Sequence, residues 1–278
     1  MTAYLSAYGK NNISIKQNLA ERIPMRLFHY TTIDAFLKIW TSKQLRFSSN
    51  LNLNDPYEKH KGYDIPWEKD DFRTFIQETK QFDKVYSGIL SSYQQISFTK
   101  NLSSKIADGF SSPAMWGHYA HNENGVCIEI DSEKLPKIPN IIKKRSVLYT
   151  KYVPVISYHI PMILEEIEID KIIQQHIKEL FFTKHIDWKY EREYRIIAKA
   201  DGELFLPLND SILSVTVYDF AGINTDIIER IIQDEVPIYG LHKGSTDGKR
   251  QLDRIDLKRY RRVMSGEHPQ KPDIILPK

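Results

Sequence analysis

The chain has 278 residues, of which 41% are hydrophobic and 12% aromatic, and its formal net charge is only +3. This length and composition favour one domain with a sizeable core. The small net charge excludes a polycation but permits local basic patches. The single cysteine, Cys127, excludes a disulfide framework and a cysteine-based metal site. Because we find no apolar leader and no run of about 18 apolar residues, we expect a cytoplasmic protein with no membrane contact.

The first element that hydrophobic periodicity predicts is a helix beginning at Thr31. Ile33, Phe36 and Trp40 recur at the spacing of one helix face. Thr31 followed three residues later by Asp34 resembles a capping box. The residues before position 25 show only weak periodicity, so we expect an N-terminal arm over residues 1–24.

The later elements follow from the same two periodicities. We predict strands at 45–48, 95–99, 125–131 and 146–149, and helices at 68–82, 113–120 and 160–182. Strands at 193–199, 203–206 and 212–218, a helix at 224–234 and strands at 236–241 and 251–257 follow. Helices gather in the first two-thirds of the chain and strands in the last third, which indicates an α+β fold with an antiparallel or mixed sheet.

Glu191 and Glu193 form the pair of acidic residues that most suggests chemistry. In a strand their side chains project to the same face, and Arg195 joins them there. The alternative is an edge strand with solvated charges and a Glu–Arg pair. The apolar run 196–198 that follows indicates a strand entering the core, and a charged start to such a strand suits the wall of a cleft.

His29 and Tyr30 immediately precede the predicted first helix. A histidine beside an apolar run is more often a packed, hydrogen-bonded core residue than a functional one. A strand-to-helix junction is nevertheless a place where backbone N–H groups and side chains converge on ligands. A distant His and a paired-Glu strand together suggest a cleft that recognises a ribose and stabilises a cation.

Two further groups of side chains have both a structural and a functional interpretation. His118 and His121 have the spacing of a metal pair, but no third ligand follows at a recognisable distance. Trp116 and Tyr119 share one helix face, as core or as the wall of an aromatic pocket. The C-terminal run contains the basic residues Lys258, Arg259, Arg261 and Arg262, which we name as candidate nucleic-acid-binding residues, although short charge runs are more often solvated faces.

The order of four motifs resembles a widespread bacterial family, domain of unknown function 2971 (DUF2971). The motifs are Leu27–Thr32, Leu45–Ser48 with Asn54–Glu58, Met115–Ala120 with Gly125–Cys127, and Trp188–Arg195. This resemblance spans residues 25–200. The family in turn resembles, more distantly, the ADP-ribosyltransferase superfamily.

The resemblance implies an ADP-ribosyltransferase-like split sheet, mixed or antiparallel, with flanking helices. It implies a single catalytic domain over residues 25–260, followed by a basic tail over 261–278. The implied activity is transfer of ADP-ribose from NAD, a substrate rather than a bound cofactor, without a metal. The implied acceptor is a nucleic acid in preference to a protein, and the implied setting is a toxin–antitoxin pair, with a possible antitoxin partner, or phage defence.

Site residues carry over from the resemblance position by position. Glu193 would be the catalytic glutamate and Glu191 the first carboxylate of the Glu-x-Glu pair, while His29 would both hold the nicotinamide-side ribose or amide and belong to the catalytic set. The residues that would bind NAD are His29, Tyr30, Thr31, Ser97, Trp116 and Tyr119. A carboxylate beside the ribose opposes the positive charge of an oxocarbenium-like transition state, and a second carboxylate can take a proton from the acceptor.

Two alternatives from other classes stay open. One is a non-catalytic nucleotide- or RNA-binding module, which would use the aromatic and basic residues and leave the glutamates as surface charges. The other is a metal-dependent nuclease that would use Asp55, Glu58, His118 and His121.

Overall fold

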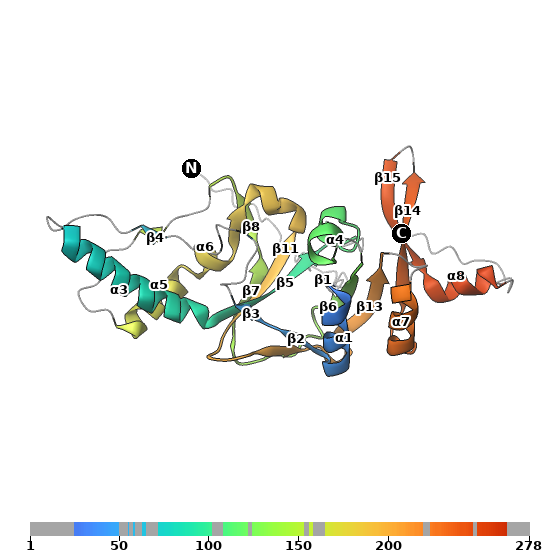
Figure 1. Ribbon diagram of the computed structural model, residues 1–278, viewed down its shortest axis with the longest axis horizontal. Helices are drawn as coiled ribbons and strands as arrows, with labels where there is room; N and C mark the ends of the chain where they lie inside the picture. Colours follow the sequence, from blue (N-terminus) through green and yellow to red (C-terminus); the bar gives the residue numbers. More distant parts are fainter. Residues whose placement is uncertain are drawn as a thin grey trace, which may run out of the picture.

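The computed structural model describes residues 25–49, 55, 58, 63–64, 72–101, 108–121, 124–152, 156–157, 165–218, 223–246 and 249–265. The expected arm over residues 1–24 and the chain after residue 265 lie outside these ranges. A long mixed sheet forms the middle of the molecule, with helices on both faces and a β-hairpin projecting at one end (Figure 1).

The main sheet has nine strands in the described part of the chain, in the order β15-β14-β13-β6-β1-β5-β11-β7, and β3 also pairs with β5. Its strands are β1 (Arg26–Thr31), β3 (Ser48–Ser49), β5 (Tyr93–Lys100), β6 (Val126–Asp131), β7 (Ile141–Ser146), β11 (Glu193–Lys199), β13 (Ile212–Val217), β14 (Ile238–Thr246) and β15 (Lys249–Asp256). All pairs are antiparallel except β13 with β14. That parallel pair requires a crossover, which α7 (Ile223–Ile232) supplies.

Short strands form three small two-stranded sheets beside the main one. β2 (Gln44–Arg46) pairs with β12 (Phe205–Pro207), β8 (Leu148–Thr150) with β10 (Thr183–His185), and β4 (Tyr63–Asp64) with β9 (Ile156–Ser157). The helices are α1 (Ile33–Ser42), α3 (Phe72–Ser91), α4 (Pro113–Tyr119), α5 (Glu166–Gln175), α6 (Ile177–Phe181), α7 and α8 (Leu257–Met264), with 3-10 helices η2 (Ile186–Glu191) and η3 (Asn209–Ser211).

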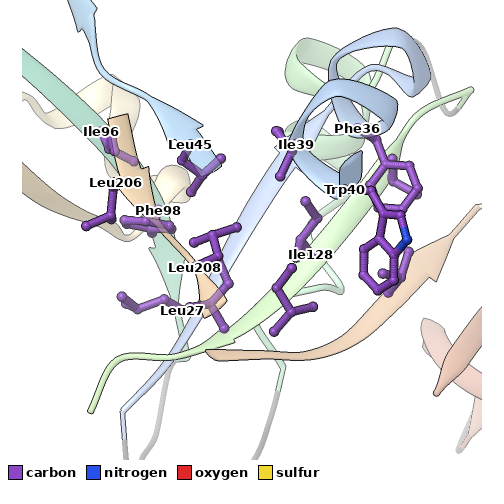
Figure 2. Packing of buried hydrophobic residues seen from close by; sticks show 14 of the residues in the cluster. Leu27, Phe36, Ile39, Trp40, Leu45, Ile96, Phe98, Ile128, Leu206 and Leu208 are labelled. Atoms are coloured by element: carbon purple, nitrogen blue, oxygen red, sulfur yellow. The ribbon is translucent and has the colours of Figure 1, made fainter. Parts of the chain in front are cut away.

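One face of the sheet is covered by α1 and α7. Phe36, Ile39 and Trp40 are the buried residues of α1, and they pack in one cluster with Leu27 and Ile128 of the central strands (Figure 2). Helix α1 is capped by Thr32, whose hydroxyl accepts a hydrogen bond from the Ala35 N–H. Thr31 is therefore the last residue of β1, and our prediction of Thr31 as the capping residue was wrong by one position.

The opposite face carries two separate apolar clusters. One surrounds α4 and includes Trp116 and Phe28. The other joins α3, α5 and α6 to β5 and β11, through Tyr93 and Ile197. Between the two clusters the sheet presents polar residues on this face, and that polar strip is where the candidate site lies.

The predicted α+β class and mixed sheet are confirmed, whereas several element boundaries differ. The helix predicted over 160–182 is two helices, α5 and α6, separated at His176, whose φ and ψ of −101° and 21° are not helical. The helical spacing of apolar residues continues across His176, so periodicity alone predicts one uninterrupted helix. We did not predict β7, because its lysines and arginine mask a strand at the edge of the sheet. We did not predict α8 either, in which Leu257 is the only buried apolar residue among those whose side chains the structure describes.

We had expected Glu191 to lie in a strand, but it does not. It ends η2, and Arg192 then adopts a left-handed conformation with φ 48° and ψ 44° before β11 begins at Glu193. The Arg192 side chain is held by Asp108 at 3.2 Å. The strand prediction failed because a turn of 3-10 helix followed by one left-handed residue leaves no signature in the alternation of charged and aromatic residues.

Candidate active site

The hydrogen-bond ladder of the sheet is interrupted beside β5. β1 pairs with β6 along all six residues, but with β5 only at Leu27↔Lys100 and Phe28↔Thr99. On the same side of β5, β3 pairs at Gln94 and Gln95. In the described part of the chain, residues 96–98 of β5 therefore have no strand partner on that side, and we call this interruption the ladder gap.

A cavity of about 200 Å³ opens at the ladder gap. It is lined by both faces of β5, by residues from β1, β2, β3, β10, β11, α4 and η2, and by Glu58: His29, Tyr30, Arg46, Ser48, Glu58, Gln95, Ile96, Ser97, Phe98, Thr99, Met115, Tyr119, Lys184, Glu191, Glu193 and Arg195. Pockets that enclose a whole small-molecule ligand usually measure roughly 300–1,000 Å³. This cavity therefore suits one part of a dinucleotide-sized ligand.

Arg195 organises one wall of the cavity. Its side chain is fully buried, and its Nε and Nη2 donate to the two carboxylate oxygens of Glu193 at 2.7 and 2.6 Å. Its Nη1 donates to Glu58 Oε1 at 2.5 Å and to the carbonyl oxygen of Phe181 at 2.6 Å. A bidentate Arg–carboxylate pair is among the strongest and most directional polar contacts in proteins, so Glu193 is held in one orientation.

Lys184 joins the three carboxylates of the site. Its Nζ lies 2.7 Å from Glu191 Oε2, 3.3 Å from Glu58 Oε2 and 3.7 Å from Glu193 Oε2. The other Glu191 oxygen, Oε1, accepts a hydrogen bond from the Tyr119 hydroxyl at 2.5 Å. Three carboxylates against two cations leave this carboxylate–cation cluster one negative charge in excess when all five groups are ionised.

The two candidate catalytic glutamates have opposite electrostatic surroundings. Burial alone would raise the pKa of Glu193, but attraction and hydrogen bonds from Arg195, with Lys184 adding to them, hold it below the usual value. Burial raises the pKa of Glu191 above the usual value, and Glu193 adds repulsion, while Lys184 opposes the shift. Glu193 thus remains ionised at pH 7, whereas Glu191 takes up a proton at a higher pH than Glu193 does. A pair of carboxylates whose pKa values are pushed apart is typical of acid–base chemistry.

His29 occupies the ladder gap itself. Its Nδ1 lies 3.3 Å from the carbonyl oxygen of Ser97, where a backbone bond between β1 and β5 would otherwise form. Because a carbonyl only accepts, Nδ1 must carry the hydrogen. Burial lowers the pKa of His29, despite the opposing effect of this bond. At pH 7 the ring is therefore neutral, and its Nε2 is a hydrogen-bond acceptor.

The cavity brings together most, but not all, of the site residues that we predicted. His29, Tyr30, Ser97, Tyr119, Glu191 and Glu193 line it. Two other predicted NAD-binding residues, Thr31 and Trp116, are buried outside its lining. The Trp116 indole N–H donates to the Phe110 carbonyl at 2.7 Å, and its ring packs on Tyr30. Trp116 supports the wall of the cavity from behind.

The predicted nucleic-acid-binding residues lie elsewhere, on α8. Lys258, Arg259, Arg261 and Arg262 are all exposed. Arg261 pairs with Asp226 and Glu229 of α7, and Lys258 pairs with Asp234. Figure 1 shows α8 near the opposite end of the sheet from β11.

We did not predict Lys184, because it stands alone in a short strand and gave no signal. We had recognised Arg195 only as part of a charged strand start, and Glu58 only as a candidate metal ligand. The useful signal was available in part: a fully buried arginine two residues after Glu193 requires carboxylate partners.

Glu58, His118 and His121 do not form one cluster. Glu58 faces Arg195 and Lys184, whereas His118 is exposed and packs beside Tyr119 and Tyr190. Within the ranges that the structure describes, no three His, Cys, Asp or Glu side chains gather as metal ligands. Within the same ranges, no helix combines the length and apolar character needed to cross a bilayer. Cys127 is buried.

These observations define a class: an α+β protein with a buried carboxylate–cation cluster at a gap in a mixed sheet. A family model described as a protein of unknown function (DUF2971) matches residues 115–196. The matched segment contains Tyr119, Lys184, Glu191, Glu193 and Arg195, and the match supports the DUF2971 family that the four motifs resemble. No curated protein and no solved structure matches the chain.

Proposed function

We propose that this protein is an ADP-ribosyltransferase that uses NAD and transfers ADP-ribose to a macromolecular acceptor. One observation carries the proposal. His29, Tyr119, Glu191 and Glu193 come from four separate elements, and they line one cavity with a neutral imidazole and two carboxylates of different acidity.

Cleavage of the nicotinamide–ribose bond develops positive charge on the ribose, as glycoside cleavage does. An ionised Glu193, fixed by Arg195, would oppose that charge without reorganising during the reaction. The excess negative charge of the carboxylate–cation cluster acts in the same direction. It also favours the cationic nicotinamide end of NAD over the phosphates as the part that enters the cavity, in agreement with the cavity volume.

Glu191 is suited to activate the acceptor. A general base works best when its pKa is near the operating pH, and burial moves the pKa of Glu191 upward in that direction. The neutral His29 contributes an acceptor nitrogen, which can receive a hydrogen bond from a ribose hydroxyl or from the carboxamide N–H₂.

A nucleic acid is the acceptor that we favour over a protein. The exposed basic residues of α8 support this choice, since cations on one helix suit contacts with a phosphate backbone. A bacterial toxin–antitoxin or phage-defence setting, a cytoplasmic location and an antitoxin partner are parts of the same proposal that rest on the family resemblance.

The test measures nicotinamide release from NAD by chromatography, with RNA, DNA, protein lysate or water as the acceptor. Glu193→Gln keeps the size of the side chain and should lower the rate by about 10²–10³-fold, the usual loss when one preorganised electrostatic group is removed. Glu168→Gln is the matched control, because Glu168 is exposed, pairs with the exposed Lys171 and does not line the cavity. An inactive wild-type protein with every acceptor, or a fully active Glu193→Gln variant, would overturn the proposal.

One observation favours a second function, that of a non-catalytic nucleotide- or RNA-binding module. Both oxygens of Glu193 already accept hydrogen bonds from Arg195, as they would in a purely structural ion pair. This alternative predicts NAD or RNA binding without nicotinamide release, and binding unchanged in Glu193→Gln. The same release assay, combined with a titration, separates the two functions.

A further inference from the structure

Three polar side chains of β5 follow one another along the face that carries the cavity. Gln95, Ser97 and Thr99 alternate along the strand and so share one face. The register with β11 sets Thr99 opposite Glu193 and Ser97 opposite Arg195. All three side chains line the cavity.

Two of these side chains hold buried polar atoms that lack a hydrogen-bond partner in the described part of the chain. They are Thr99 Oγ1 and Gln95 Oε1, on residues that are only 1% and 2% exposed. The other end of the Gln95 amide, Nε2, donates to Ser97 Oγ at 3.3 Å. If the amide is turned over, Nε2 becomes the atom without a partner, so one end of Gln95 is free in either assignment.

Buried polar atoms without partners are rare in native proteins, because removing them from water without a new hydrogen bond is unfavourable. Such atoms also occur away from the cavity, for example Thr216 Oγ1 on β13. A buried polar atom without a partner is therefore not sufficient evidence, by itself, of a ligand-binding residue. At Gln95 and Thr99 it coincides with a cavity, with the ladder gap and with the proposed catalytic carboxylate.

The charge of the site limits what these atoms can bind. Glu58, Glu191 and Glu193 outnumber Lys184 and Arg195, so a phosphate or a carboxylate would meet repulsion there. A hydroxyl group meets none, and it both donates and accepts. It can therefore satisfy the threonine hydroxyl and either end of the glutamine amide.

We propose that Gln95 and Thr99 are ligand-binding residues that hydrogen-bond the hydroxyls of a neutral sugar ring held beside Glu193. This inference rests on the proposed function, in which that ring is the nicotinamide-side ribose of NAD. It adds Gln95 and Thr99 to Ser97, the residue of β5 that we predicted to bind NAD.

The proposal predicts an unusual combination of effects for two variants, the isosteric Thr99→Val and Gln95→Leu. Thr99→Val removes only a buried hydroxyl without a partner, so this variant should be at least as stable as the wild type in urea unfolding. Gln95→Leu also removes the hydrogen bond from Nε2 to Ser97 Oγ, so the comparison of stability is made with Thr99→Val. Both variants should bind the sugar more weakly, by about 3–10-fold, the loss expected for one neutral hydrogen bond. If these side chains had a purely structural role, replacing them would lower the stability of the protein and leave its affinity for the sugar unchanged.

Binding is measured by calorimetric titration with carba-NAD, which keeps the ribose hydroxyls but has no cleavable glycosidic bond, and with nicotinamide as the probe without a sugar. Thr216→Val is the matched control, since it removes the same kind of atom outside the cavity. It should leave the affinity for carba-NAD unchanged.

The expected result is weaker binding of carba-NAD, but not of nicotinamide, by Thr99→Val and Gln95→Leu, with undiminished stability of Thr99→Val. If the wild type binds carba-NAD and both variants bind it equally well, or if Thr99→Val loses stability, the inference is overturned and the proposed function stands. If the wild type binds no carba-NAD, the proposed function fails, and this inference fails with it.

Discussion

Replacing Arg195 with methionine should destabilise the protein by about 3–5 kcal/mol at pH 7, the usual result when one partner of a buried ion pair is removed. Arg195 is fully buried and donates four hydrogen bonds, three of them to the carboxylates of Glu193 and Glu58. Its loss leaves both carboxylates buried, with Lys184 as the cation that still contacts them.

The penalty should depend on pH in a defined direction. In the variant, burial is no longer opposed by Arg195, so the pKa of Glu193 in the folded state rises above the unfolded value of about 4.3. Each unit of that rise costs about 1.4 kcal/mol at neutral pH, so 3–5 kcal/mol corresponds to a rise of roughly two to four units shared by the two carboxylates. The cost begins to decline as the pH falls below the raised pKa, and it disappears near the unfolded value of about 4.3, below which the carboxylates are protonated in both states.

Urea unfolding at pH 7 and pH 4.5 measures both effects. Lys199→Met is the control, since Lys199 is a cation on the same strand whose ion pair with Asp170 is partly exposed. It should cost no more than about 1 kcal/mol. Two results would refute the argument that Arg195 holds Glu193 ionised. One is a loss of stability in Arg195→Met of less than about 1 kcal/mol at pH 7, and the other is an equal loss of stability at both pH values.

Three further predictions test other parts of the site. Trp116→Phe leaves the buried Phe110 carbonyl without its donor, so it should cost about 1–3 kcal/mol in urea unfolding, yet change carba-NAD affinity less than twofold; a larger change in affinity would make Trp116 a ligand contact. Burial lowers the pKa of His29 in the folded state, so stability should fall as the pH drops below the unfolded value of about 6.5, and His29→Gln should flatten that slope; an unchanged slope would contradict a neutral His29. Lys184→Met removes the cation that opposes the raised pKa of Glu191, so the acidic limb of the pH–rate profile should move up by about one pH unit or more. Lys184→Arg keeps the positive charge and should leave the profile near its wild-type position. A profile that is the same in the wild type and both variants would exclude Glu191 as the base.

Sequence patterns predicted the parts of this fold that depend on local periodicity. The apolar face of α1 and the strand at Glu193–Lys199 follow from spacing alone. Glu191 could not be assigned correctly, because its position depends on a left-handed Arg192 that Asp108 holds from a distant segment. Lys184 was invisible for a related reason: its significance comes from three carboxylates that lie together only in the folded chain.

We also predicted more aromatic residues in the wall of the site than the structure places there, because Tyr119 lines the cavity and Trp116 does not. Trp116 and Tyr119 lie three residues apart on α4, and that spacing cannot say which of the two points toward the core. The structure separates them: Trp116 is fully buried, whereas the Tyr119 hydroxyl reaches Glu191.

The ladder gap gives the centre of the sheet an unusual dynamic property. Amides in the middle of a large sheet normally exchange with solvent deuterium only when the whole domain unfolds. On β5, the carbonyl of Ser97 faces the gap, and its N–H points to the same side because both backbone groups of one residue in an antiparallel strand do so. This N–H has no strand partner there, so it should exchange quickly while the amides of Ile96 and Phe98, which face β11, remain protected. A ligand in the cavity would slow this exchange, which makes hydrogen exchange at Ser97 a direct record of occupancy that needs no knowledge of the reaction.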